Sequence, residues 1–346
     1  MGDEENAIKS VKCPVCTKEI VETESACPYC GHVSQQFYDS DFHVSASEAL
    51  KKGKLFYYGE DGHTKNSDKA LEYFMIAAEQ GNSDAQFLVG FCYDNAHGVN
   101  LNQSEAFKWY LKAAGQGDAE SQFNVGTSYF NGEGVVKNAT EAFYWFFNAA
   151  EKSYSEALYM LGYCYFNGEG ITKDLNKSIE CFRKAAELGN SYAQFNLGSA
   201  YFYGHGTDQS YEEAIKWFKL AAVQDDPEAE YMLGYAYYFG EGFKQDYRQA
   251  FRHFAKSANF ENPHAQYYLA CCYYHGRGVA KDLSESLRWI NRAAELGHAD
   301  AIKKKEKIIA RQLEEEAIET IKSNEIKFRP ILRRIAKIKK ILKHFL

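Results

Sequence analysis

The sequence has few prolines and no long apolar run, and both features limit the classes of protein to which it can belong. Five prolines in 346 residues favour a mostly helical chain, because proline removes a backbone hydrogen bond from a helix interior. No apolar run reaches the roughly 18 residues that a membrane-spanning helix needs. The acidic opening MGDEENAIKS lacks the apolar core of a secretory signal, so we expect a cytoplasmic location.

Short catalytic signatures are also absent. The sequence contains no Ser-x-x-Lys, no His-Glu-x-x-His and no P-loop. The net charge of −7 is unevenly spread, because residues 326–346 hold eight Lys and Arg and no acid. The remainder is therefore strongly acidic, which argues against nucleic-acid binding by that part of the chain. We expect a protein that is not an enzyme.

What the sequence does have is a unit of 36 residues that recurs seven times over about residues 47–298, most clearly at Ser155–Asn190. A ladder of glycines advances in steps of 36 residues: Gly62, Gly98, Gly134, Gly170, Gly206, Gly242 and Gly278. A ladder of alanines does the same: Ala78, Ala114, Ala150, Ala186, Ala222, Ala258 and Ala294. Repetition at this period is the signature of a solenoid, in which each unit packs on the next.

Each unit is predicted to contain two helices. Ala157, Leu161 and Tyr165 share one stripe at helical spacing, which indicates the first helix. The second helix follows the loop Gly168–Lys173, and its N-cap position always holds a side chain that can accept a backbone hydrogen bond. These seven residues are Asn66, Asn102, Asn138, Asp174, Ser210, Asp246 and Asp282. A glycine inside the first helix, as at Gly162, suggests the close approach of a neighbouring helix.

The pattern Leu161-Gly162-x-x-Tyr165, Gly168-x-Gly170 and Ala185-Ala186-x-x-Gly189 resembles the Sel-one-like repeat (SLR), a relative of the tetratricopeptide repeat. The resemblance implies an all-α fold, an α/α solenoid of helix-turn-helix repeats that winds into a tetratricopeptide-like superhelix and serves as a scaffold. The first copy departs from the pattern, because Asp61 is an extra residue.

Two positions of the first helix vary from repeat to repeat and lie four residues apart, on a face separate from the core stripe. In tetratricopeptide arrays the corresponding face lines a concave groove. We predict that this face binds a protein or peptide partner, with rings as apolar anchors and amides for its backbone; ordinary solvent or packing positions are the alternative. The residues are Phe91, Asn95, Thr127, Asn131, Tyr163, Asn167, Ser199, Tyr203, Tyr235, Phe239 and His275.

Four cysteines near the N-terminus form two C-x2-C pairs, namely Cys13 with Cys16 and Cys27 with Cys30. Each Cys-Pro-x-Cys turn aims two thiolates at one point, and two such turns suit a tetrahedral structural Zn²⁺. We predict a small zinc ribbon over residues 11–33, which the pattern also resembles. A rubredoxin-like iron site, disulfides and free thiols are the alternatives.

The remaining segments are assigned by composition and period. Residues 1–10 are expected to be disordered, 34–46 to be a linker, 299–323 to be a helix that caps the solenoid, and 324–346 to be a basic amphipathic tail. The tail is predicted to dock on the acidic body, on an anionic membrane surface or on a partner protein.

The sequence thus predicts a non-enzymatic scaffold that carries a structural zinc ribbon. A zinc-ribbon protein associated with nucleic acid is the first alternative, and its ribbon could be tested by salt-dependent binding to oligonucleotides. An SLR-type hydrolase is the second alternative, since some cysteine-rich SLR proteins have been linked to β-lactam hydrolysis.

Overall fold

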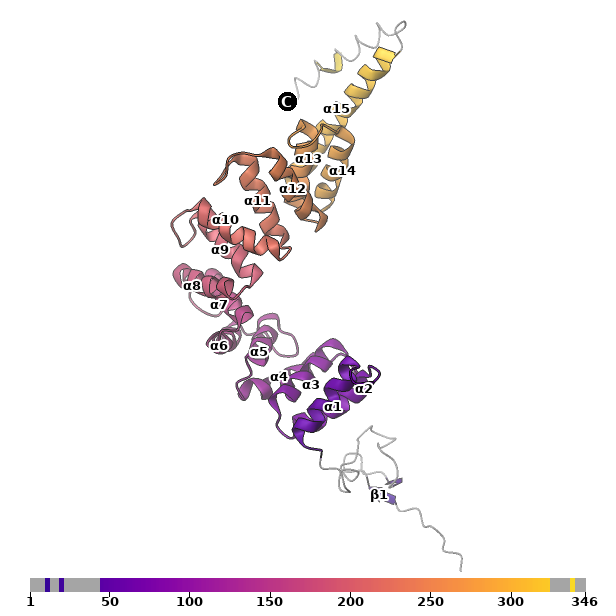
Figure 1. Ribbon diagram of the computed structural model, residues 1–346, viewed down its shortest axis with the longest axis vertical. Coiled ribbons are helices and arrows are strands. Elements are labelled where there is room, and N and C mark those ends of the chain that lie inside the picture. Colours follow the sequence, from indigo (N-terminus) through magenta and orange to yellow (C-terminus); the bar gives the residue numbers. More distant parts are fainter. Residues whose placement is uncertain (1–9, 13–18, 22–43, 324–336, 340–346) are drawn as a thin grey trace, which may run out of the picture. The chain divides into compact units, whose positions relative to one another are not determined.

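A computed structural model describes residues 10–12, 19–21, 44–323 and 337–339 (Figure 1). Two short strands, β1 (Ser10–Lys12) and β2 (Glu19–Val21), pair antiparallel with Lys12 opposite Glu19. The helices that follow are α1 (Ala46–Tyr58), α2 (Ser67–Glu79), α3 (Ser83–Asn95), α4 (Gln103–Gly115), α5 (Ala119–Asn131), α6 (Ala139–Ala150), α7 (Ser155–Asn167), α8 (Leu175–Glu187), α9 (Ser191–Tyr203), α10 (Tyr211–Val223), α11 (Pro227–Phe239), α12 (Tyr247–Asn259), α13 (Pro263–His275), α14 (Leu283–Glu295) and α15 (Ala299–Ser323). The predicted helical repeat solenoid is confirmed for residues 46–323.

The chain divides into two compact units. Unit 1 comprises residues 1–121 with 133–135, and unit 2 comprises residues 122–132 with 136–346. Within each unit, successive helices pack on one another, from α1 to α4 in unit 1 and from α6 to α15 in unit 2. The core is therefore a row of clusters, each shared by several successive helices, as expected where every repeat buries its apolar face against its neighbours.

The second helix of each repeat, called helix two below, begins at the predicted N-cap. Asp174 shows the geometry, because its Oδ1 accepts a hydrogen bond of 3.1 Å from the backbone N–H of Lys177. The same cap bond forms at Asn66, Asn102, Asn138, Ser210, Asp246 and Asp282. Each cap satisfies a backbone N–H that the helix itself leaves free. The predicted N-cap column is confirmed at all seven positions.

The glycine in the middle of the first helix, called helix one below, lies against a ring of helix two. A methyl group at Gly198 would come within 2.8 Å of the ring of Phe218, and Gly126 and Phe146 stand in the same relation. The predicted close approach is confirmed, and the approaching helix is helix two of the same repeat. Glycine is retained at this cost in helix propensity because any side chain would displace the ring.

The Gly-x-Gly loop joins one repeat to the preceding one. Gly168 and Gly170 have φ of 80° and 71°, in the left-handed region that glycine adopts without strain. A side-chain carbon at Gly170 would collide with the backbone oxygen of Ala139, the first residue of α6. The loop after α7 therefore packs directly on the start of α6. The same contact recurs at Gly98, Gly134 and Gly278, whereas Gly62 in the first repeat has no atom within 4 Å of a side-chain carbon.

The first repeat differs from the others in its local geometry. Ser45 caps α1 by accepting a hydrogen bond from the N–H of Glu48, so the helix begins at Ala46, one residue before the expected start at 47. The extra residue Asp61 adopts a φ of 50°, and the chain is back in phase at Gly62. One added residue in the loop thus offsets the early start of the helix.

At the other end, α15 packs on α14 through the buried side chains of Ala301 and Ile308. Lys281, in the loop before α14, forms an ion pair of 2.5 Å with Glu315 of α15. Of the tail, the structure describes only residues 337–339, which are helical. No helix in the described residues is both long enough and apolar enough to cross a membrane.

Candidate functional site

The structure gives the predicted partner-binding face a third position. Four residues before each variable pair, helix one carries an aromatic ring in six successive repeats: Phe87, Phe123, Tyr159, Phe195, Tyr231 and Tyr267. These rings are half-buried, and Tyr159 lies with its ring centroid 5.9 Å from that of Phe182 on helix two. We call the three positions together the helix-one face. The ring at the first position, which we call the aromatic base of the face, is held in place by packing. The residues at the other two positions differ from repeat to repeat.

The middle position of the face is only partly accessible. Thr127 uses its hydroxyl within the helix, donating a hydrogen bond of 3.0 Å to the backbone oxygen of Phe123. Phe91, Ser199 and Tyr235 are half-buried, and Tyr163 is the most exposed of the predicted residues at this position. In the last repeat the equivalent residue, Cys271, is 4% exposed, and Lys304 of α15 lies 3.0 Å from its sulfur. The accessible face therefore ends before α15.

The outer position is exposed in every repeat that was predicted to use it. Asn95 and Asn167 donate their side-chain N–H to the backbone oxygen four residues earlier, at 3.0 and 3.2 Å. Each amide keeps its oxygen as an acceptor and its second N–H as a donor, so both can still bond the backbone of a partner. Asn131 and His275 are also exposed.

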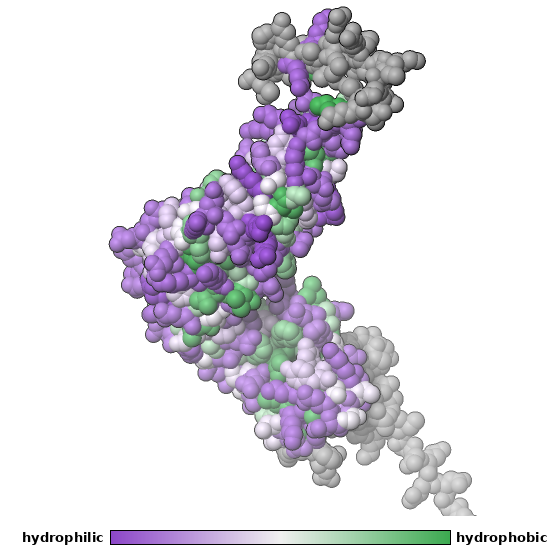
Figure 2. Space-filling view, turned by 45° about the horizontal axis from the view of Figure 1, so that its top comes forward, coloured by the Kyte–Doolittle hydropathy of each residue, from purple (hydrophilic) through white to green (hydrophobic). Residues whose placement is uncertain are grey.

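Aromatic side chains gather at the face between α9 and α13. The ring centroid of Tyr235 lies 4.5 Å from that of Phe239 and 5.9 Å from that of Tyr268. Tyr203 is 55% exposed and stacks on His205, and Phe239 is 46% exposed. On the face drawn in Figure 2, apolar residues reach the surface in several separate patches among hydrophilic ones. We call Tyr203, Tyr235, Phe239 and Tyr268 the aromatic cluster.

The four side chains of this cluster carry no formal charge, but a carboxylate, Glu241, lies near two of them. Burial raises the pKa of Tyr268 to about 12, and burial with the charge of Glu241 raises the pKa of Tyr203 and Tyr235. All three phenols therefore keep their proton at neutral pH and can donate hydrogen bonds. Burial lowers the pKa of His275, and the nearby charges of Lys304 and Arg277 lower it further, so this imidazole is neutral as well.

Sequence reasoning missed the aromatic base of the face and Tyr268. The signal for the base was present, since an aromatic residue recurs at steps of 36 from Phe87 to Tyr267. Tyr268 carries no such signal, because the equivalent positions hold unrelated residues such as Asn196 and Met232. Its place in the cluster becomes visible only once α11 and α13 are packed together.

The predicted zinc ligands, Cys13, Cys16, Cys27 and Cys30, lie outside the described residues. Within the part of the chain that the structure describes, no group of three or more His, Cys, Asp or Glu side chains is arranged to hold a metal ion. Burial raises the pKa of Cys92 to about 11, and burial with the charge of Glu169 raises that of Cys164 to about 12. Both thiols are buried and protonated, as expected for core residues.

Comparison with known families identifies the class of protein. Seven consecutive segments match the Sel1 repeat: residues 53–82, 83–118, 119–154, 155–190, 191–226, 227–259 and 263–298. These segments cover most of the chain, and the protein belongs to the Sel1 repeat family. Sel1 repeat proteins typically act as protein-interaction scaffolds and are generally not enzymes. No curated protein sequence matches the chain.

Two solved structures share both fold and sequence with the chain. A protective antigen of uropathogenic Escherichia coli strains that displays an SLR fold is 34% identical, with a TM-score of 0.69 over 75% of this chain and 55% of that one. A Sel1 repeat protein from Oxalobacter formigenes is 32% identical, with a TM-score of 0.64 over 71% of this chain and 99% of that one. The chain thus spans about half the length of the E. coli protein.

Proposed function

We propose that this protein is a non-enzymatic scaffold that binds an extended segment of a protein partner along the helix-one face of unit 2. The observation that carries the proposal is the aromatic cluster. It combines exposed rings with protonated phenols, and its four side chains carry no formal charge, which suits apolar side chains and the backbone of a partner. The exposed amides of Asn131 and Asn167 extend the same face toward α5 and α7.

The roles of the predicted residues differ within this proposal. Tyr203 and Phe239 are the anchors, because they are exposed and their rings can be covered by a partner. Tyr235 serves mainly to hold Phe239 and Tyr268 in place, since it packs against both rings. Replacing Tyr235 would disturb the fold of the face, so the anchors are the better positions for a test.

The test compares capture of protein from cell extract by a double variant of the face and by a single variant outside it. Tyr203→Ser with Phe239→Ser removes both anchors and should abolish capture of the main partner. Phe260→Ser is the matched control, because Phe260 is 57% exposed at the end of α12 and lies outside the face. Capture that survives the first pair of changes would exclude the aromatic cluster as the binding surface.

The predicted tail, 324–346, enters the proposal as a second attachment point. Its eight basic residues and apolar period favour docking on the acidic body of the same chain, with an anionic membrane surface or a partner as the other possible targets. Deleting residues 325–346 should lower the thermal midpoint of the final repeats, and the full-length protein should pellet only weakly with anionic vesicles. Strong pelleting that the deletion abolishes, without loss of stability, would make the tail a membrane anchor.

The predicted zinc ribbon and the cytoplasmic location complete the proposal. The ribbon is supported by the spacing of the two C-x2-C pairs and by the pairing of β1 with β2, which flank the first pair in sequence. The location is supported by the five free thiols of the repeats, which a reducing compartment preserves.

A further inference from the structure

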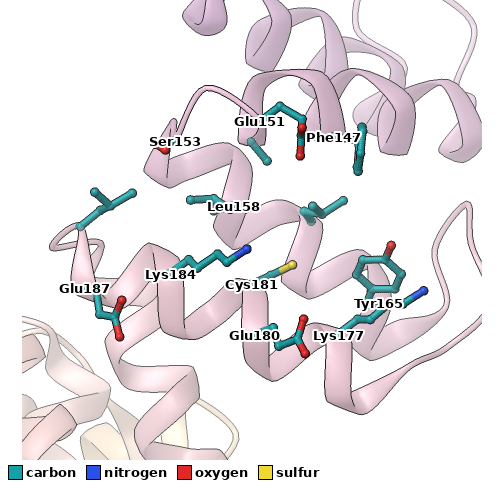
Figure 3. Close-up of a pocket in the computed structure, with 13 residues that line it drawn as sticks. Phe147, Glu151, Ser153, Leu158, Tyr165, Lys177, Glu180, Cys181, Lys184 and Glu187 are labelled. Carbon is teal, nitrogen blue, oxygen red and sulfur yellow. The ribbon is translucent and has the colours of Figure 1, made fainter.

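A cavity of about 540 Å³ opens on unit 2 among α6, α7 and α8 (Figure 3). It lies on a different side of α7 from the helix-one face. Phe147, Leu158, Leu161 and Leu188 contribute apolar surface to it. Figure 3 shows Cys181 of α8 in the middle of the lining residues. A cavity of this volume is within the range of pockets that bind ligands.

The cavity coincides with a departure of the fourth repeat from the others. Cys181 occupies a position of helix two that carries a ring in each of the six other repeats. These residues are Tyr73, Trp109, Trp145, Trp217, His253 and Trp289. The fourth repeat is thus the one that lacks a ring at this position, and it is the repeat in which the cavity lies.

In the next repeat, the same place is filled by the protein itself. Trp217 packs in a cluster with Ala186, Leu197 and Tyr201. One repeat earlier, the equivalents of these three residues are Ala150, Leu161 and Tyr165, and all three line the cavity. Trp109 and Trp289 lie in clusters of the same composition. Trp109 is grouped with Ala78, Val89 and Tyr93. Trp289 is grouped with Ala258, Leu269 and Tyr273.

A second departure makes the fourth repeat more apolar at this place. In the second repeat Gln116 donates a hydrogen bond of 2.7 Å to the side-chain oxygen of Gln86, and Gln224 bonds Gln194 at 2.9 Å in the fifth. The fourth repeat holds two leucines, Leu158 and Leu188, at the equivalent positions, and both line the cavity. A polar pair with one buried and one exposed member is thereby replaced by apolar surface, of which Leu188 is 53% exposed.

We infer that this cavity binds a tryptophan side chain presented by a partner polypeptide, which takes the place that an indole of the chain itself occupies in neighbouring repeats. The shape argument comes from the repeat symmetry, since the surrounding residues have the same layout as those that hold Trp217, Trp109 and Trp289. This inference goes beyond the proposed function, because it concerns another side of α7 and does not depend on the aromatic cluster.

The surroundings of the cavity indicate what kind of molecule presents the ring. Charged side chains line it beside the apolar ones, with Glu151, Glu180 and Glu187 set among Lys177 and Lys184. These groups can bond the backbone and side chains that flank a tryptophan, which a free indole lacks. A second copy of this fold would not supply the ring, because none of its four tryptophans is exposed.

Cys181 lines the cavity with a small side chain that leaves room for a ring. Burial raises the pKa of its thiol to about 11, with Glu180 adding to the rise and Lys184 and Lys177 opposing it. The thiol is therefore protonated at neutral pH and is not an activated nucleophile. Cys181 differs from its six equivalents because its side chain has no ring.

The test titrates the full-length protein with N-acetyl-L-tryptophanamide and follows the methyl NMR signals of Leu158, Leu161 and Leu188. Saturable shifts are expected for the wild type, with weaker binding of indole and none of N-acetyl-L-leucinamide. Cys181→Trp should fill the cavity, abolish the shifts and raise the thermal midpoint. Leu158→Gln, which installs the residue of the second and fifth repeats, serves as a second variant and should weaken binding several-fold.

Three results would overturn the inference. The absence of saturable shifts in the wild type would mean that the cavity does not take an indole. Binding that persists in folded Cys181→Trp and Leu158→Gln would place the site elsewhere. Indole that binds as tightly as N-acetyl-L-tryptophanamide would make the cavity a site for small indole compounds, not for a polypeptide.

Discussion

Ser178 on α8 donates a hydrogen bond of 2.8 Å from its hydroxyl to the backbone oxygen of Gly162 on α7, in the buried centre of the fourth repeat. One turn further along α8, the ring of Phe182 lies over Gly162, where a methyl group would come within 2.7 Å of it. The seventh repeat keeps the hydrogen bond, from Ser286 to Ala270, but has Ile290 where the others have a ring. In the seventh repeat, Ala270 thus stands where the other repeats have glycine, and Ile290 leaves no ring for its methyl group to displace.

This relationship predicts a coupled pair of substitutions. Gly162→Ala should destabilise the protein by about 1–3 kcal/mol, because the new methyl group overpacks the contact with Phe182. Gly162→Ala combined with Phe182→Ile reproduces the seventh repeat and should cost less than the sum of the two single changes. The measurement is a double-mutant cycle of urea denaturation.

The control for this cycle is Gly115→Ala. Gly115 ends α4 with open space around it, so alanine there should leave stability unchanged or raise it by up to about 1 kcal/mol. Additive costs for Gly162→Ala and Phe182→Ile would show that the two positions do not constrain each other.

A second prediction concerns the buried carboxylate of Glu230. It accepts hydrogen bonds from His253 at 2.6 Å and Lys256 at 2.9 Å. Burial acts to raise the pKa of Glu230, but these two partners outweigh it and hold the pKa below its ordinary value of 4.5. Below that ordinary value the unfolded chain binds more protons than the folded chain. The stabilisation is therefore complete above about pH 4.5 and is lost as the pH falls through the folded pKa.

Glu230→Gln tests this linkage with little change in shape, because glutamine is the residue at the equivalent position of four other repeats: Gln86, Gln122, Gln194 and Gln266. The stability lost by Glu230→Gln at pH 7 should shrink as the pH falls below about 4.5. Glu230→Ala should cost about 1–3 kcal/mol at pH 7, because it leaves the bonding partners without an acceptor. A cost for Glu230→Gln that is the same at pH 7 and pH 4 would argue against a stabilising carboxylate.

A third prediction concerns the metal. Protein purified without a histidine tag should contain one Zn²⁺ per chain, bound by Cys13, Cys16, Cys27 and Cys30. Elemental analysis gives the zinc content, and Cys27→Ser should lower it strongly. Cys92→Ser is the matched control, because that thiol is buried in the repeats and should not affect the metal. Full zinc occupancy in Cys27→Ser would rule out this set of ligands, and iron in place of zinc would favour the rubredoxin-like alternative.

Much of the fold could be predicted because the repeat supplies the same information seven times. Helix ends require the caps at Asn66 through Asp282, and close packing requires the glycine of helix one. Both requirements are local, and both recur along the array of repeats. The accessible part of the face could be predicted less well. The burial of Cys271 depends on Lys304 of α15, and the amides of Asn95 and Asn167 turn back on their own helix.

The cavity at Cys181 shows a different limit of sequence reasoning. The missing ring is visible in the sequence once the repeats are aligned, but its consequence is not. Only the packing of Trp217 against Ala186, Leu197 and Tyr201 shows which residues the ring would have covered in the fourth repeat. A residue that departs from a repeat is therefore informative chiefly when the contacts of its equivalents are known.

The most direct measurement of the central claim is site-specific photo-crosslinking from the helix-one face. The photoreactive residue p-benzoyl-L-phenylalanine would replace Phe239 in one protein and Phe260 in another, both being exposed phenylalanines of unit 2. If the aromatic cluster binds the partner, irradiation in cell extract should give a discrete adduct from position 239 and none from position 260. Equal adducts from both positions, or an adduct from position 260 alone, would contradict the proposal that the partner binds this face.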